Sequence, residues 1–226
     1  MYIEERKEEE TGRDYAYRII RNNIIYRELK PGVMLSEKEI GDQLGLSRTP
    51  VREALIELAK TQIVEILPKR GSRVSYINYE LMEEAEFVRK SLELAIVRLA
   101  CDMRTEEDLI ELKKNLMLQE IYLETRDHIK FMELDNSFHQ KLFQICNKKQ
   151  AYEMMTSICV HLDRVRDLAL TTVKDLKIVD DHIKIADAIR DRDKDAATNI
   201  MSYHLDRYKI DKEAVRNAHP ELFSND

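Results

Sequence analysis

A long stretch of this chain lacks the two residues that most often interrupt helices. From residue 79 to residue 219 the sequence contains neither glycine nor proline, although it has 5 and 4 of them in all. Because these residues most disfavour a helix interior, the stretch predicts an all-helical domain. Its apolar residues recur at helical spacing, and we expect a bundle of about six helices. The expected helices are 79–102, 106–124, 127–147, 149–173, 176–191 and 193–217.

The first 78 residues are instead divided by turn residues. A helical pattern over 11–29 ends at Lys30-Pro31-Gly32, because proline disfavours a helix in the residue before it. A second, short helix is expected over 37–44. A capping box formed by Ser36 and Glu39 would begin it.

A third helix and a hairpin complete this region. Gly45 permits a sharp turn, Ser47 is a candidate N-cap, and Pro50 falls in the first helical turn, where its missing N–H costs little. Two β-like runs, 63–67 and 72–76, flank a Pro-Lys-Arg-Gly turn and predict a hairpin. Helix, helix, turn, helix and hairpin is the order of a winged helix-turn-helix.

The sequence therefore predicts a mainly α chain with two domains, which suits its 226 residues. We expect a winged helix-turn-helix over 11–78 and an all-helical domain over 79–218. A charged, frayed N-terminus (1–10) precedes them, and a short tail (219–226) follows.

Charge and residue type indicate that the first domain binds DNA. The chain has a net charge of −6, but residues 11–78 carry 12 Lys and Arg against 8 Asp and Glu. Such a local excess is expected where one module meets phosphate. In a helix-turn-helix the start of the second helix faces the bases, and Arg48 and Arg52 share one face there, suited to guanine. Ser47 and Thr49 could donate to phosphate or base.

A family resemblance supports this interpretation. The residues that carry it are Pro31-Gly32, Leu35-Ser36-Glu37, Leu44-Gly45-Leu46-Ser47-Arg48-Thr49-Pro50-Val51-Arg52-Glu53-Ala54-Leu55 and Pro68-Lys69-Arg70-Gly71-Ser72-Arg73-Val74. They resemble the GntR-family DNA-binding domain, except that Thr61-Gln62 replaces a more usual Glu-Gly. The DNA contacts that the resemblance implies are Lys38, Arg48, Thr49, Arg52, Arg70 and Gly71.

Histidines of the second domain have a spacing that suits a metal site. Asp135 and His139 are four residues apart, so one helix can present both to the same point. His182 and His204 are 22 residues apart on successive expected helices, and antiparallel packing would bring both to that pair. One carboxylate and three imidazoles suit Zn²⁺, Ni²⁺, Mn²⁺ or Fe²⁺. A hydrogen-bonded core position is the alternative for each histidine.

The helical region also resembles a known domain. The matching segments are Phe87-Val88-Arg89-Lys90-Ser91-Leu92-Glu93, Asp135-Asn136-Ser137-Phe138-His139, Asp181-His182 and Met201-Ser202-Tyr203-His204-Leu205. They are similar to the FCD domain of the FadR subfamily. Many of its members bind a divalent metal through Asp-x3-His and two later histidines. The resemblance therefore implies a metal site at Asp135, His139, His182 and His204.

Two further residues are candidates for binding an effector. The resemblance places Arg89 at a position that can line the pocket, where it and a bound metal would attract a carboxylate. Arg89 could alternatively form a surface ion pair with Glu86 or Glu93. His161 could face the same cavity or lie at an interface.

The expected function is a DNA-binding transcriptional regulator, most simply a repressor controlled by a small organic acid. A homodimer would match a near-palindromic operator. One alternative is a metal sensor in which the ion is the effector, and another is a purely structural metal. A metal-dependent hydrolase with a DNA-binding tether is disfavoured, because the sequence has no separate acid–base constellation, phosphate loop or nucleophile motif.

Composition limits the location of the protein. The three cysteines are widely spaced, so we expect reduced, buried thiols rather than disulfides. No apolar run resembles a signal peptide or a membrane span. We therefore expect a cytoplasmic protein without a membrane partner.

Overall fold

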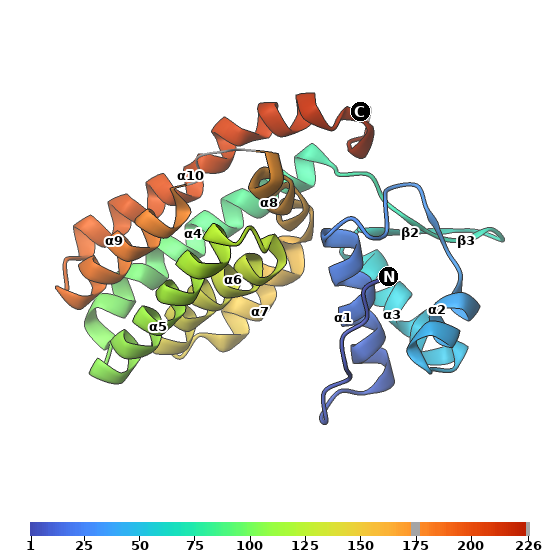
Figure 1. Cartoon of the computed structure of the whole chain (residues 1–226), viewed down its shortest axis with the longest axis horizontal. Helices are drawn as coiled ribbons and strands as arrows, with labels where there is room; N and C mark the ends of the chain where they lie inside the picture. Colours follow the sequence, from blue (N-terminus) through green and yellow to red (C-terminus); the bar gives the residue numbers. More distant parts are fainter. Residues whose placement is uncertain (173–176, 225–226) are drawn as a thin grey trace. The chain divides into compact units, whose positions relative to one another are not determined.

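Helices make up nearly all of the second part of the chain, as its lack of glycine and proline predicts. The computed structural model describes residues 1–172 and 177–224, and these form two compact units. One unit comprises Met1–Met82 together with the residues from His219 onward, and the other comprises Glu83–Ala218 (Figure 1). Among the described residues no helix is both long and apolar enough to cross a membrane.

The N-terminal unit is a winged helix-turn-helix, as predicted. Its helices are α1 (Gly12–Ile25), α2 (Glu37–Leu44) and α3 (Arg48–Lys60). Its strands are β1 (Met34–Leu35), β2 (Val64–Leu67) and β3 (Gly71–Val74), and they form an antiparallel sheet in the order β1-β3-β2. The strand β1 was not predicted from the sequence, because two residues are too few to show an alternating pattern.

Packing of α1 against α3 provides the core of this unit. Ile20, Val51 and Leu58 are almost completely buried, as helical spacing predicts. The first helix is shorter than predicted and ends at Ile25, because Arg27 adopts a left-handed backbone conformation with φ of 65°. Lys30-Pro31-Gly32 therefore lies beyond the helix end and does not cause it.

Residues 1–10 have little regular structure, but they lie along α1 rather than fraying. The backbone of Tyr2 makes two hydrogen bonds with the Asn23 side chain, at 2.7 and 2.8 Å. Arg18 donates to Glu10 at 2.5 and 2.8 Å and also pairs with Glu4. Composition alone indicated a solvated segment, because the partner of Glu4 and Glu10, Arg18, lies on a helix beyond the segment.

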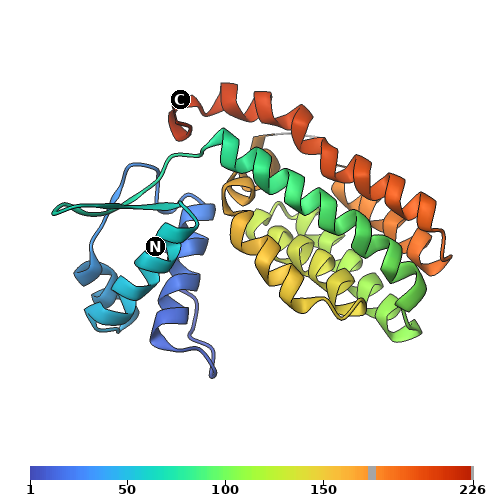
Figure 2. The same ribbon diagram turned by 180° about the vertical axis from the view of Figure 1, so that it is seen from behind.

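The second unit contains seven helices over the described residues, one more than expected. They are α4 (Tyr79–Met103, which begins in the first unit), α5 (Glu106–Glu124), α6 (His128–Ile145), α7 (Lys149–Ile158), α8 (Val160–Thr172), α9 (Ile178–Arg190) and α10 (Lys194–Ala218). In both views α4 and α10 lie side by side (Figure 2). Lys90 with Asp206 and Arg98 with Asp195 join them at 2.5 and 3.0 Å.

The additional helix arises where the predicted helix 149–173 divides into α7 and α8. Met155 is the one buried residue within α7, whereas every residue from Val160 to Ala169 is buried in α8. One straight helix could not bury the two segments to such different extents, and the helix is interrupted at Cys159 between them. The expected ends at 173 and 176 lie outside the described residues. All three cysteines are free and buried, as expected.

The contact between the N-terminal segment and α1 can be tested through Arg18. Hydrogen bonding to Arg18 lowers the pKa of Glu10 from 4.5 to about 2. This interaction therefore stabilises the bound segment above pH 4.5 and is lost as the pH falls toward 2. We expect Arg18→Gln to expose residues 1–10 to a glutamate-specific protease at neutral pH. Arg13→Gln is the control, because Arg13 is exposed and pairs with neighbouring Asp14; equal cleavage of both variants would contradict the contact.

Candidate nucleic-acid interface and metal centre

The start of α3 presents its polar residues to solvent. Ser47 precedes the helix in an extended conformation, and its side chain makes no capping hydrogen bond. Arg48, Thr49 and Arg52 are all exposed. The N–H groups of a first helical turn lack helical acceptors, so this end of α3 offers both N–H donors and cationic side chains to a DNA backbone.

The wing adds a second exposed basic site in the same unit. Arg70 is exposed in the turn between β2 and β3, Gly71 is exposed at the start of β3, and Lys38 is exposed on α2. Gly71 has φ of 101°, a conformation that a side chain would strain. Arg73, a basic residue on β3, donates to Glu65 on the adjacent strand at 2.6 Å.

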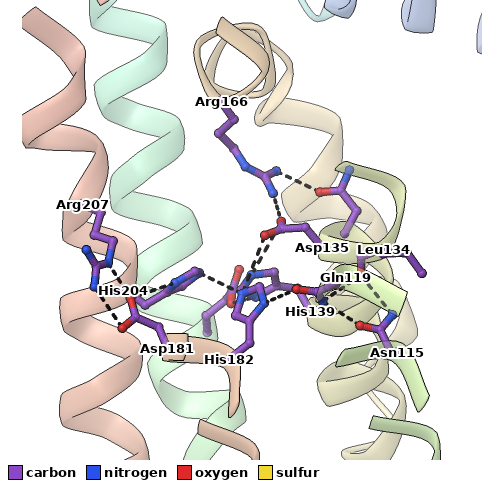
Figure 3. Close-up of polar contacts among 12 residues, drawn as sticks. Asn115, Gln119, Leu134, Asp135, His139, Arg166, Asp181, His182, His204 and Arg207 are labelled. Carbon is purple, nitrogen blue, oxygen red and sulfur yellow. Dashed lines mark hydrogen bonds and ion pairs between the residues drawn. The ribbon is translucent and has the colours of Figure 1, made fainter. Parts of the chain in front are cut away.

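Three predicted metal ligands converge inside the helical unit. His139 on α6, His182 on α9 and His204 on α10 are each at most 3% exposed. One nitrogen from each lies within 4.8 Å of the others. Asp135, one turn before His139, has carboxylate oxygens 3.7 Å from His182 Nε2 and 4.0 Å from His139 Nε2 (Figure 3). The structure thus brings all four predicted residues together, with the three histidines forming the tightest group.

The protonation state of His139 follows from its neighbour on α4. His139 Nδ1 contacts Glu93 Oε2, and Arg89 donates to the other Glu93 oxygen at 2.7 Å. Burial raises the pKa of Glu93, but His139 and Arg89 outweigh this effect and lower it to about 2. Burial also lowers the pKa of His139, despite Glu93. A neutral His139 therefore donates from Nδ1 and keeps a lone pair on Nε2, which is buried without a hydrogen-bond partner.

The tautomer of His182 is set by a chain of hydrogen bonds anchored at a backbone carbonyl. Leu134 O can only accept, and it accepts from the Asn115 amide at 3.0 Å. Asn115 Oδ1 then accepts from the Gln119 amide at 2.7 Å, so Gln119 Oε1 faces His182 Nδ1 at 2.8 Å. His182 must therefore carry its proton on Nδ1, and the lone pair of Nε2 points into the cluster. Burial, and then His204, hold its pKa well below 6.5.

His204 has an acidic neighbour on α9. Its Nδ1 lies 3.7 Å from Asp181 Oδ2, and Arg207 holds the Asp181 carboxylate at 2.5 and 3.0 Å. A carboxylate on this side favours the proton on Nδ1. His204 Nε2 lies 3.2 Å from His182 Nε2. One nitrogen of each imidazole lies within 4.8 Å of the others, and such a donor set suits a divalent cation.

Asp135 is the fourth potential ligand, and an arginine orients it. Arg166 on α8 pairs with Asp135 Oδ2 and also with Asp163 at 2.8 Å. Burial raises the pKa of Asp135, but Arg166 and His182 outweigh it and keep the carboxylate ionised. Its other oxygen, Oδ1, is the one nearest His182 Nε2.

The two predicted effector residues have different outcomes. Arg89 is 4% exposed and bonds to Glu93, so its ion pair lies in the interior and not on the surface. His161 is also buried, on α8, but the three-histidine group of the described residues does not include it.

The residues that orient the three histidines and Asp135 were not predicted from the sequence. They are Glu93, Asn115, Gln119, Arg166, Asp181 and Arg207. Two of them had a local signal, since Glu93 is four residues after Arg89 and Asp181 directly precedes His182. The others reach the cluster from α5, α8 and α10, and only the helix packing brings them there.

The hydrogen-bond chain to His182 generates a prediction. Gln119→Leu removes the acceptor of His182 Nδ1, and we expect Zn²⁺ affinity to fall about ten- to hundred-fold. Competition against a chelating dye would measure it. Gln144→Leu is the matched control, because Gln144 is exposed on α6. Equal affinities for both variants would show that Gln119 does not orient a metal ligand.

Comparison with known proteins agrees with both units. Residues 13–74 match the bacterial regulatory proteins of the gntR family, and residues 84–207 match the FCD domain. The chain is 35% identical to the HTH-type transcriptional repressor RspR of Escherichia coli K12, over 93% of this chain and 92% of that one. It is 25% identical to the Nta operon transcriptional regulator of Aminobacter aminovorans, over 86% and 92%.

A solved structure shares the fold. E. coli McbR/YncC superposes with a TM-score of 0.80 at 21% identity, covering 93% of this chain and 99% of that chain. Both curated relatives are named as transcription regulators, the class of protein that the sequence predicts for this chain. The chain belongs to the GntR family of bacterial DNA-binding transcription regulators, with an FCD domain as its second unit.

Proposed function

We propose that this regulator is a repressor of the FadR subfamily whose operator affinity is controlled by a small carboxylate bound at a divalent metal. The observation that carries the proposal is the convergence of the imidazoles of His139, His182 and His204, one nitrogen of each within 4.8 Å of the others, beside Asp135. Similarity to a protein named a repressor supports the direction of control. As a DNA-binding protein without a candidate membrane helix in its described part, it would act in the cytoplasm.

The donor set supports a metal ion. His139 Nε2 is buried without a hydrogen-bond partner. If His182 and His204 both carry their proton on Nδ1, neither Nε2 atom can donate a hydrogen bond to the other. Asp135 Oδ1 and the three imidazoles would hold the ion, and Zn²⁺, Ni²⁺, Mn²⁺ or Fe²⁺ accept such ligands. When bound, the ion would supply a positive charge and a coordination position for an effector oxygen.

The charges around the cluster favour an anionic effector. The ion pairs connect four acids with three arginines, which leaves a net charge of −1. A divalent ion would change this to +1. A buried charge is costly unless it is paired, so one carboxylate would complete the balance. The acids are Glu93, Asp135, Asp163 and Asp181, and the arginines are Arg89, Arg166 and Arg207.

A metal sensor is the second candidate, because the three histidines are almost wholly buried and could hold the ion as the effector itself.

A thermal-shift screen of carboxylic acids with and without metals separates the two candidate functions. If the proposal holds, one acid raises the melting temperature only with metal present and changes operator binding. Stabilisation and altered DNA binding by the metal alone would favour the sensor, and stabilisation without altered DNA binding would favour a structural metal.

The DNA-binding part of the proposal predicts a strong effect at Arg52. We propose that two copies of the chain bind two half-sites, with the start of α3 in the major groove. Arg52→Ala should weaken operator binding on the order of ten- to hundred-fold, because one bidentate contact to guanine is lost. Lys60→Ala, at the other end of α3, is the control. Fluorescence anisotropy measures both, and light scattering checks that each remains a dimer; equal affinities would contradict the α3 assignment.

The metal part predicts a loss of bound ion. His182→Ala combined with His204→Ala removes two of three imidazoles, so purified protein should lose its stoichiometric metal in elemental analysis. His128→Ala is the control, because His128 is partly exposed and lies beside Asp167. Full metal retention in the double variant would refute the site.

A further inference from the structure

The C-terminal residues belong to the DNA-binding unit, although α10 before them belongs to the helical unit. After Ala218 the chain forms a short 3₁₀ turn, Pro220–Leu222, and pairs with the segment that leaves the wing. Ile77 N–H donates to Leu222 O at 2.9 Å, and Ser224 N–H donates to Ile77 O at 3.0 Å. This pairing forms a parallel bridge between Ile77 and Phe223.

Side chains bury this contact. Phe223 stacks on the Tyr79 ring, with centroids 5.1 Å apart and planes inclined by 14°. Ile77, Leu222 and Phe223 are at most 9% exposed. Backbone pairing and buried apolar side chains together make Ile77 and Tyr79 a specific docking site for residues 219–224.

The segment that receives the tail connects the wing to the helical unit. Ile77 is three residues after β3, Ser75 N–H donates to Ile63 O at 3.0 Å, and α4 begins at Tyr79. The helical unit is therefore connected to this linker through two segments of the chain. One route is the direct continuation into α4, and the other is the return of the tail from α10.

The helix that precedes the tail carries part of the candidate metal centre. His204 lies on α10, Arg207 of the same helix holds Asp181, and Asp206 binds Lys90 on α4 at 2.5 Å. A shift of α10 that follows a change in coordination at His204 would therefore also move residues 219–224, which pair with the linker.

We propose that residues 219–224, the C-terminal strap, dock at Ile77 and Tyr79 and couple the state of the His139/His182/His204 cluster to the linker of the DNA-binding unit. The coupling rests on the proposed metal control, whereas the docking itself does not. A strap of this kind transmits a signal only if the ligand favours one position of α10 over another.

Amide hydrogen exchange on the full chain tests the proposal, with Zn²⁺ as the probe. In wild type we expect Zn²⁺ to change exchange at residues 75–78. Phe223→Ala should abolish this response while Zn²⁺ affinity remains unchanged. Glu221→Gln is the matched control, because the Glu221 side chain is 66% exposed in the same turn, and it should behave as wild type. A response that persists in Phe223→Ala, or is missing in wild type that binds Zn²⁺, would overturn the coupling.

Metal-free protein provides the separate test of docking. There Phe223→Ala should accelerate exchange of the Ile77 amide on the order of ten-fold, because its acceptor is Leu222 O in the strap. Unchanged exchange would overturn the strap. Wild type that binds no Zn²⁺ would contradict the proposed metal centre and the coupling, but this docking measurement would still decide whether the strap exists.

Discussion

Burial of charge is the constraint on which the helical unit depends. Its interior holds arginines and carboxylates that would be very costly without partners. Three pairs meet this need, and each has at least one almost completely buried member: Arg89–Glu93, Arg166–Asp135 and Arg207–Asp181. Arg166 joins α8 to α6, and Arg207 joins α10 to α9. A change in helix register would break these pairs, so the charges specify one arrangement of the helices.

The same pairing orients the imidazoles. Glu93, Gln119 and Asp181 each lie beside the Nδ1 atom of one histidine. Burial keeps His139 and His182 neutral, so their Nε2 lone pairs remain available. A site organised in this way before its ligand arrives loses little conformational entropy on binding. The chemistry of the cluster is therefore a consequence of helix packing rather than of the ligands alone.

Sequence analysis predicted the elements and the residues that carry local patterns. Arg48 and Arg52 share a helix face, and Asp135 and His139 are one helical turn apart, so both pairs were visible in the sequence. The orienting role of Gln119 was not predictable, because it depends on contacts between α5 and α9. The break at Cys159 was missed for a similar reason: 149–173 has continuous helical periodicity, and only the different burial of α7 and α8 divides it.

Effector control of DNA binding must act through the segments that connect the two units. The linker after β3 leads into α4, and the strap after α10 returns to the same linker. Suppose that the protein has a higher affinity for the effector when α10 is in one position than in another. Linkage then requires the effector affinity to rise whenever the DNA-binding unit favours that position of α10. Operator DNA would then change effector affinity by the same factor by which the effector changes operator affinity. The six residues of the C-terminal strap are sufficient for this reciprocity, because the strap only has to pair with the linker and does not have to span the helical unit.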